Sequence, residues 1–589
     1  MLTFGPTNYR NDSCGEQERY SLHKLGMRTI LDANAKLSNS SVRAVVRHSI
    51  IFLITILLCV SITAQRKAVR RSTAKGQPAV SKVAELNAVA SAAVNAAVAA
   101  VKANAWEAAE RQARVAVGAA PMSAITHNVL GVVLDRTGHG EEAIREFKLA
   151  LGLDPNFVGA RNNLGRMMAE RGETTQAIAE FERILQTDPF HVEAHYNLGS
   201  LYAASGNFKA AAEQFAHARE GAPNDAELAL AFLNVAYRAN RISEAETAAD
   251  LVERRASSDP RTLFTLATVL AESKQYEHAV RLFEAVNKLT PHVYEVLYDL
   301  GIALYNLDRN DEAARYLAAA ADLNPGPAET HYRLALIASS ANDHHNAILE
   351  FKHAIERDKG NATYHFLLAR EYARVGYWEG AIQENTTAIQ INPKDSAYIY
   401  ARANANYRGG EAAAAAADFD LAAQLDPNIE NIDYLRGYAH RAAGNLEKAR
   451  EILAMVVAAH PNHVDALASL GFINIEQGTM DDAETLLKRA LSVEPNNVSV
   501  LYDYARIAVK RRDFKEAIIR LRRVTKNDPA HTQAHYQLFL TYSRLRDAEK
   551  AQAELAEFKR LEELEKRVKD ERIYDDKLRT QQVVGQSQN

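Results

Sequence analysis

The sequence predicts an all-α solenoid made of about thirteen copies of a helix-turn-helix unit. An alanine recurs at one phase every 34 residues, and a proline follows most of these alanines twelve residues later. A fixed period of this length is typical of solenoids, in which each unit covers the apolar face of its neighbour. The alanines are Ala109, Ala143, Ala177, Ala211, Ala245, Ala279, Ala313, Ala347, Ala381, Ala415, Ala449, Ala483, Ala517 and Ala551. The prolines are Pro121, Pro155, Pro189, Pro223, Pro291, Pro325, Pro393, Pro427, Pro461, Pro495 and Pro529.

Each unit contains the signals for two short helices and the turn that joins them. Small residues in the first helix, as in Leu198-Gly199, allow the second helix to cross closely. The proline ends the second helix, because it cannot continue an α-helix and restricts the residue before it. A glycine between the helices supplies the left-handed residue that ends the first helix. These glycines are Gly138, Gly172, Gly206, Gly376, Gly410, Gly444 and Gly478.

One copy shows the full pattern, from Phe190 to Asn224. It contains Leu198, Gly199, Tyr202, Ala211, Phe215, Ala218 and Pro223. This pattern resembles the tetratricopeptide repeat, and the resemblance covers about residues 90–560. It implies a right-handed α-solenoid superhelix with a concave groove lined by the first helices. It also implies a noncatalytic scaffold or adaptor that binds peptides or domains of other proteins in that groove.

The predicted organisation has five parts. Residues 1–64 form an N-terminal extension with a signal peptide or signal anchor, and residues 65–89 form a flexible linker. Residues 90–123 form a partial first repeat, and residues 124–558 form the main array. Residues 559–589 form a charged capping helix and a frayed tail, since a polar-faced helix commonly ends a solenoid. A partner-binding coiled helix is the alternative for this last part.

The N-terminal part contains an apolar segment, Ile50 to Ala64, which follows Arg43 and Arg47. A positive flank, a short apolar core and small residues at its end are typical of a secretory signal. The segment is shorter than the roughly 20 residues that span a bilayer. We therefore expect cleavage near Ala64 and an exported, periplasmic protein. An uncleaved membrane anchor and a buried core helix are the alternatives.

Charge and cysteine content exclude some classes of function. The chain has 70 Lys and Arg against 74 Asp and Glu, a formal net charge of −4. Because no overall positive charge is present, we expect no nucleic-acid partner. The two cysteines, Cys14 and Cys59, precede the expected cleavage point, so they predict neither a disulfide framework nor a cysteine metal site.

Tyrosines and polar residues at two adjacent positions of the first helix are the candidate groove residues. Tyrosine is a good interface anchor, although the same tyrosines could serve repeat packing. Asparagines at this phase, at residues 128–200, resemble the ladder by which some tetratricopeptide arrays bind a peptide backbone. The candidates are Asn128, Asn162, Asn163, Tyr196, Asn197, Tyr298, Asp299, Tyr332, Arg333, Tyr400, Tyr434, Tyr502, Asp503 and Tyr536.

No catalytic signature stands out. The sequence has no Gly-x-Ser-x-Gly elbow and no phosphate-binding glycine loop. The histidine pairs in HVEAH and HTQAH, at His191 and His531, lack the H-E-x-x-H order of a zinc protease. We therefore expect no enzyme activity, no cofactor and no metal. An envelope role in assembly, export or secretion fits the signal segment. A membrane-anchored receptor and a noncatalytic subunit of a separately encoded enzyme, such as a glycosyltransferase, are the alternatives.

Overall fold

The predicted all-α repeat fold is confirmed. The computed structural model describes residues 87–585, with side chains to residue 568, and every regular element in this part is an α-helix. The 28 helices alternate as first and second helices of successive pairs, from α3 and α4 to α29 and α30. Residues 87–324 and residues 325–585 belong to two separate compact units. The predictions for residues 1–64 and for most of the linker concern residues outside the described part of the chain.

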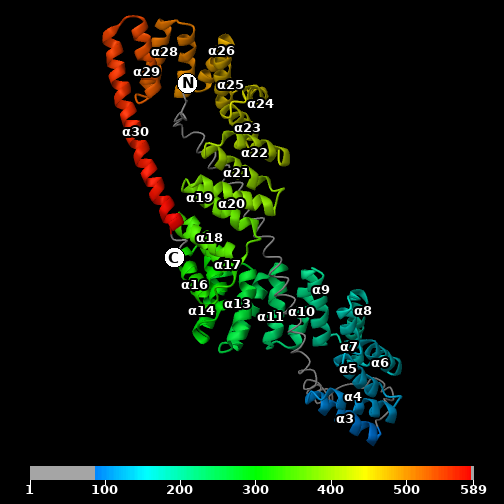
Figure 1. Cartoon of the computed structure of the whole chain (residues 1–589). Coiled ribbons are helices and arrows are strands. Elements are labelled where there is room, and N and C mark those ends of the chain that lie inside the picture. The colour runs from blue at the N-terminus through cyan, green and yellow to red at the C-terminus, as the bar shows by residue number, and fades with distance from the viewer. Residues whose placement is uncertain (1–86, 586–589) are drawn as a thin grey trace. The chain divides into compact units, whose positions relative to one another are not determined.

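The unit at residues 87–324 holds seven helix pairs, and the segment predicted as a partial first repeat contains both helices of a pair (Figure 1). Its helices are α3 (Ala88–Lys102), α4 (Trp106–Ala119), α5 (Ala124–Arg136), α6 (Gly140–Leu153), α7 (Val158–Glu170), α8 (Thr174–Thr187), α9 (Val192–Ala204), α10 (Phe208–Gly221), α11 (Ala226–Arg238), α12 (Ile242–Arg255), α13 (Pro260–Glu272), α14 (Tyr276–Leu289), α15 (Tyr294–Tyr305) and α16 (Asn310–Leu323).

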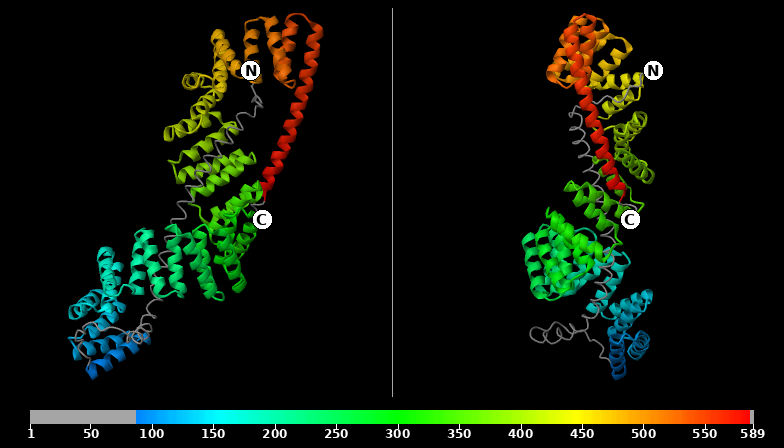
Figure 2. Two further views of the ribbon diagram at one scale, coloured as in Figure 1. Left: turned by 180° about the vertical axis from the view of Figure 1, so that it is seen from behind. Right: turned by 60° about the vertical axis from the view of Figure 1, so that its left-hand side comes forward.

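The unit at residues 325–585 holds the next seven pairs. Its helices are α17 (Ala328–Ser340), α18 (His344–Arg357), α19 (Ala362–Arg374), α20 (Trp378–Ile391), α21 (Ser396–Arg408), α22 (Ala412–Leu425), α23 (Ile432–Ala442), α24 (Leu446–Ala459), α25 (Val464–Gln477), α26 (Met480–Val493), α27 (Val498–Lys510), α28 (Phe514–Asn527), α29 (Thr532–Arg544) and α30 (Ala548–Gly585). Within each unit every pair packs beside the pair that precedes it in the chain (Figure 2).

The turn between the two helices of a pair uses a left-handed residue, as predicted. All seven predicted glycines have positive φ, for example +79° at Gly206. The other seven pairs use a residue with a Cβ at the same phase: Asn104, Asn240, Lys274, Asp308, Asn342, Arg512 and Arg546. Asn and Asp, at four of these positions, adopt this conformation without much strain, whereas it costs Lys274, Arg512 and Arg546 about 1–2 kcal/mol each.

Small residues permit the close crossing of the two helices, again as predicted. A Cβ added at Gly131 would lie 2.6 Å from the ring of Phe147, and one at Gly437 would lie 2.6 Å from Leu453. The repeated alanines are fully buried in nearly every copy, as at Ala313. Larger side chains at these positions would force the helices apart, so the sequence period reflects a packing requirement.

A buried histidine joins the two helices of five pairs. In the first of these, His127 Nδ1 lies 2.6 Å from Glu146 of the second helix, and its Nε2 lies 2.8 Å from the carbonyl of Pro121. Arg161 makes the equivalent contacts in the next pair. The histidines at this phase are His127, His195, His331, His365 and His535. In four of the five pairs the side chain thus fastens the preceding turn to the second helix, whereas His331 contacts only the second helix.

The last helix, α30, is much longer than the others. Its first part packs on α29, where Leu561 is buried and the ring of Phe558 lies 5.0 Å from that of Tyr536. Among residues 87–585, no helix combines the length and the apolar character that crossing a bilayer requires.

Candidate partner-binding surface on the first helices

The predicted asparagines lie together on three successive first helices, α5, α7 and α9. Asn163 Nδ2 donates a hydrogen bond to Asn128 Oδ1 at 3.1 Å. Asn197 Nδ2 donates in the same way to Asn162 Oδ1 at 2.9 Å. We call these four residues the amide ladder. Each bond joins one repeat to the next. The bonded residues are 35 apart in the chain, and a repeat length of 34 residues brings such positions side by side on neighbouring first helices.

The amide ladder keeps hydrogen-bonding capacity beyond these two bonds. An asparagine amide offers two donors and two acceptor lone pairs, and each internal bond uses one donor or one lone pair. All four side chains are half-buried, so part of each amide faces solvent. Such a row can bind the alternating N–H and C=O groups of an extended peptide backbone.

Tyr196 of α9 lies directly beside Asn197. Its ring packs edge-on against Phe215 at 5.4 Å between centroids. Burial raises the pKa of the Tyr196 hydroxyl, and the nearby carboxylate of Glu227 raises it further. The Tyr196 side chain is therefore uncharged. Its half-buried ring lies at the end of the amide ladder.

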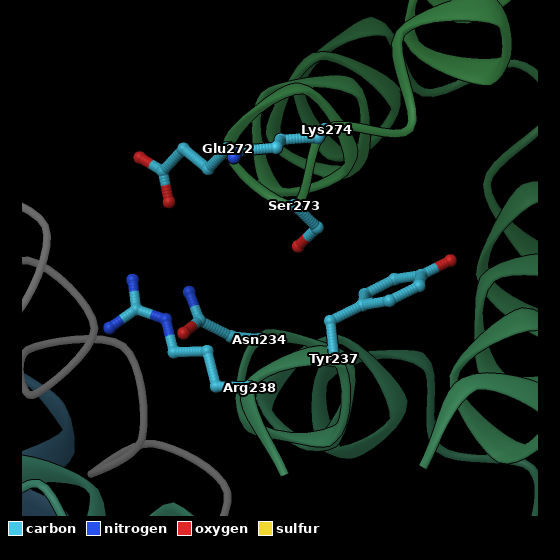
Figure 3. Close-up of a pocket in the computed structure, with 6 residues that line it drawn as sticks. All are labelled: Asn234, Tyr237, Arg238, Glu272, Ser273 and Lys274. Atoms are coloured by element: carbon cyan, nitrogen blue, oxygen red, sulfur yellow. The ribbon is translucent and has the colours of Figure 1, made fainter. Parts of the chain in front are cut away.

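A polar pocket of about 160 Å³ lies further along the first helices, between the C-terminal ends of α11 and α13. Figure 3 shows the side chains of Arg238 and Glu272 extending on the same side of this pocket, with Asn234 beside Arg238. Pockets for drug-sized ligands are about 300–1,000 Å³. The size and the charged lining therefore suit a single polar side chain of a partner better than a cofactor.

The next first helix, α15, carries the predicted residue Asp299. Burial raises the pKa of this carboxyl to about 7, and repulsion by Glu295 and Glu272 adds to the shift. Tyr298 beside it stacks on Tyr294, with ring centroids 5.7 Å apart. Three carboxyl groups thus share one region of α13 and α15, which suits a Lys or Arg side chain of a partner.

The predicted aromatic residues of the unit at residues 325–585 lie mostly in its core. Tyr332 and Tyr400 are 0% and 1% exposed, and Tyr434 is also buried. Tyr502 lies against the ring of His531, and burial raises its pKa to about 12. Tyr536, 40% exposed, is the most accessible of them. The alternative that these tyrosines serve repeat packing therefore describes Tyr332 and Tyr400 well.

The two charged candidates of this unit form ion pairs within it. Arg333 Nη2 lies 2.7 Å from Glu329, one turn earlier on α17. Asp503 is buried on α27 and lies 2.8 Å from Arg506 Nη1. The guanidinium groups of Arg506 and Arg441 both lie over the ring of Phe472. Sequence reasoning missed this Arg–Phe–Arg stack, since Phe472 and Arg506 share one repeat phase but differ in residue type, and Arg441 has another phase.

The histidines that suggested metal pairs have other contacts. His191 Nδ1 accepts the backbone N–H of Ala194 at 3.2 Å, so its ring caps α9. His531 caps α29 in the same way. A further histidine, His344 of α18, places Nδ1 2.9 Å from Glu371, a carboxylate that is 0% exposed and also accepts from Ser339 and Arg374.

Comparison with protein families identifies the class of this chain. A model described as tetratricopeptide repeat matches residues 168–234, 270–337 and 474–538. Two further models with the same description match residues 94–157 and 434–499, and residues 328–361. The matched segments together span more than half of the sequence. The chain belongs to the tetratricopeptide-repeat family, whose fold typically serves as a noncatalytic protein-interaction scaffold.

Solved structures with a similar fold are distant in sequence. The Cut9–Hcn1 hetero-tetramer of the APC/C is 15% identical, with 80% of this chain and 93% of that chain covered and a TM-score of 0.32. YrrB, a TPR protein described as having an unusual peptide-binding site, is 24% identical, with coverages of 32% and 98% and a TM-score of 0.28.

The C-terminal part of a TPR repeat-containing protein from Cytophaga hutchinsonii is 18% identical, with coverages of 41% and 98% and a TM-score of 0.34. A comparison with curated protein sequences gives no match.

Proposed function

We propose that this protein is a noncatalytic scaffold that binds an extended peptide segment of a partner along α5, α7 and α9. The observation that carries this proposal is the amide ladder, in which Asn163 bonds Asn128 and Asn197 bonds Asn162 across successive repeats. These bonds hold the amides in one row while leaving donors and acceptors for a ligand. Preorganised groups of this kind lose little side-chain entropy when a peptide binds.

The same surface contains sites for partner side chains. The pocket of Arg238 and Glu272 can take a polar side chain, and the carboxyl group of Asp299 can pair with a basic one. A bound Lys or Arg would lower the pKa of Asp299, because an opposite charge favours the ionised carboxylate. Peptides with a basic residue toward α15 should therefore bind more tightly as pH rises through about 7.

The experiment that tests this proposal uses peptides selected on the full chain from a random displayed library. Their affinity is measured by fluorescence anisotropy for the wild type and for the Asn163→Ala/Asn197→Ala variant. Each lost hydrogen bond is worth about 0.5–1.5 kcal/mol, so the double variant should bind roughly 10-fold or more weakly. Gln176→Ala, at an exposed position of α8, is the matched control and should bind like the wild type. Equal affinities for all three proteins would reject this surface.

The proposal extends to an exported protein that acts in envelope assembly, export or secretion. The apolar segment Ile50–Ala64 with its positive flank supports it. Mass spectrometry of the N-terminus, combined with cell fractionation, is the test. We expect a chain that begins at Gln65 in the soluble envelope fraction. A chain that keeps Ile50–Ala64 in the membrane fraction would contradict export and would favour a membrane-anchored adaptor.

A further inference from the structure

We propose that His331, Glu350 and His353 form a binding site for a divalent transition metal, with Zn²⁺ as the ion their chemistry suits best. Their candidate ligand atoms all lie within 4.8 Å of one another. His331 Nδ1 lies 2.7 Å from Glu350 Oε2, and His353 Nδ1 lies 3.7 Å from the same oxygen. Two imidazoles and one carboxylate are a common zinc ligand set that leaves a fourth position for water.

Two adjacent helices of one pair hold the site. His331 projects from α17, while Glu350 and His353 project from α18. A spacing of three residues places Glu350 and His353 on one face of α18. Glu-x-x-His on a helix, facing a ligand from a neighbouring helix, is an arrangement that helical bundles use for metals.

The separations suit a tetrahedral ion after small side-chain shifts. Ligand atoms at about 2.1 Å from zinc in a tetrahedron lie about 3.4 Å from one another. The distances from Glu350 Oε2 to His331 Nδ1 and to His353 Nδ1, 2.7 and 3.7 Å, lie on either side of that value. The His353 and Glu350 side chains are 34% and 22% exposed, which leaves them room to adjust and opens the fourth position to solvent.

A buried nitrogen atom without a hydrogen-bond partner provides a second, independent observation. His331 Nε2 and His353 Nδ1 are both buried and make no hydrogen bond. The His331 side chain as a whole is 9% exposed. Buried polar atoms are usually satisfied, so the orphaned His353 Nδ1, which faces Glu350 Oε2, calls for an ion or another missing ligand. His331 Nε2 points away from this cluster and does not bear on the ion.

The other histidine-containing pairs explain why His331 differs. His127, His195, His365 and His535 each place Nε2 within 3.3 Å of a backbone carbonyl six residues earlier. At His331 the equivalent carbonyl, that of Pro325, accepts instead from Arg357 Nε. The His331 ring is therefore fastened only through its Nδ1 contact with Glu350.

A natural near-copy of the site lacks one ligand. His195, Gln214 and His217 occupy the same phases as His331, Glu350 and His353, and their imidazole rings lie 5.2 Å apart, against 5.1 Å at the proposed site. Gln214 replaces the carboxylate with a neutral amide, which is a poor zinc ligand. The sequence therefore offers a matched control in the same protein.

Zinc binding displaces the proton shared between His331 and Glu350. In the metal-free site the His331 Nδ1–H group donates to Glu350 Oε2. On binding, both imidazoles contribute a nitrogen lone pair and His331 carries its hydrogen on Nε2.

The test is calorimetric titration of the full, chelator-treated chain with Zn²⁺. We expect one ion per chain for the wild type. The Zn²⁺ affinity of Glu350→Gln and of His353→Ala should be lower by about 100-fold or more. Glu350→Gln recreates the side-chain set of His195, Gln214 and His217, so it should fold. Gln214→Glu should add a second ion per chain. Co²⁺ absorption reports whether the bound ion is tetrahedral.

Two results would overturn the assignment. Absence of saturable Zn²⁺ binding by the wild type would mean that water fills the site. Equal binding by the wild type and Glu350→Gln would place the ion on other histidines.

Discussion

Lys274 occupies the left-handed turn position at which seven other repeats have glycine. Its φ is +62°, against +79° for Gly206 at the same phase two repeats earlier. Replacing Lys274 with Gly relieves about 1–2 kcal/mol of conformational strain. The added backbone freedom of glycine in the unfolded chain costs about 0.5–1 kcal/mol. Lys274→Gly should therefore stabilise the α13–α14 pair by about 0.5–1 kcal/mol, and Gly206→Lys should destabilise the α9–α10 pair by a similar amount.

Native-state hydrogen exchange is the suitable assay, because a long repeat array need not unfold in one step. The opening free energies of amides in α13 and α14 should rise in Lys274→Gly, while distant pairs remain unchanged. Lys148→Gly is the control, since Lys148 is exposed within α6 and glycine there should cost about 1 kcal/mol. A loss of stability in Lys274→Gly equal to that in Lys148→Gly would refute the role assigned to the left-handed turn.

Three further predictions concern packing and buried charge. Ala313→Leu should overpack the crossing of α15 and α16 and lower the free energy of unfolding in urea titrations by about 1–3 kcal/mol. Unfolding of the whole array would contradict this. Glu371→Ala should lower the opening free energy of amides in α17 and α19 by about 3 kcal/mol in hydrogen exchange, because His344 and Arg374 lose a fully buried partner. A decrease below about 1 kcal/mol would contradict this. The third concerns Asp299, whose folded pKa of about 7 lies above its unfolded value of about 3.9, so the folded state binds the extra proton between these values. Stability should therefore fall as pH rises from about 4 to 7, and Asp299→Asn should remove this loss in melting-temperature measurements, whereas an unchanged pH profile would contradict the burial of this carboxyl.

The fold could be predicted from the sequence because its requirements repeat. Each pair needs a small residue at the crossing and a left-handed residue at the turn, and 34-residue spacing makes both visible. Lys274 and Arg512 stand at the phase of the turn glycines, but their residue types alone do not indicate φ above zero. There, the packing of both helices imposes a conformation that the side chain itself disfavours.

The site could be predicted only in part. The repeat phase of Asn163 and Asn197 predicts that they lie on the same face of successive first helices. It does not predict the hydrogen bonds they form, which depend on the offset between adjacent repeats. His331 and Glu350 are 19 residues apart and lie on different helices. Their pairing could be predicted only if the relative rotation of the two helices were known. Burial of Tyr332 and Tyr400 also depends on the neighbouring repeat, so identical phases gave tyrosines of different exposure.

Photo-crosslinking of a bound partner peptide tests the central claim most directly. A photoreactive amino acid replaces Tyr196 on the first helix α9 in one protein and Gln176 on the second helix α8 in another. The account predicts crosslinks to the peptide from position 196 and none from position 176, with the crosslinks at 196 lost in the Asn163→Ala/Asn197→Ala background. Crosslinks from position 176 alone would show that the partner binds the second helices, and would contradict the account.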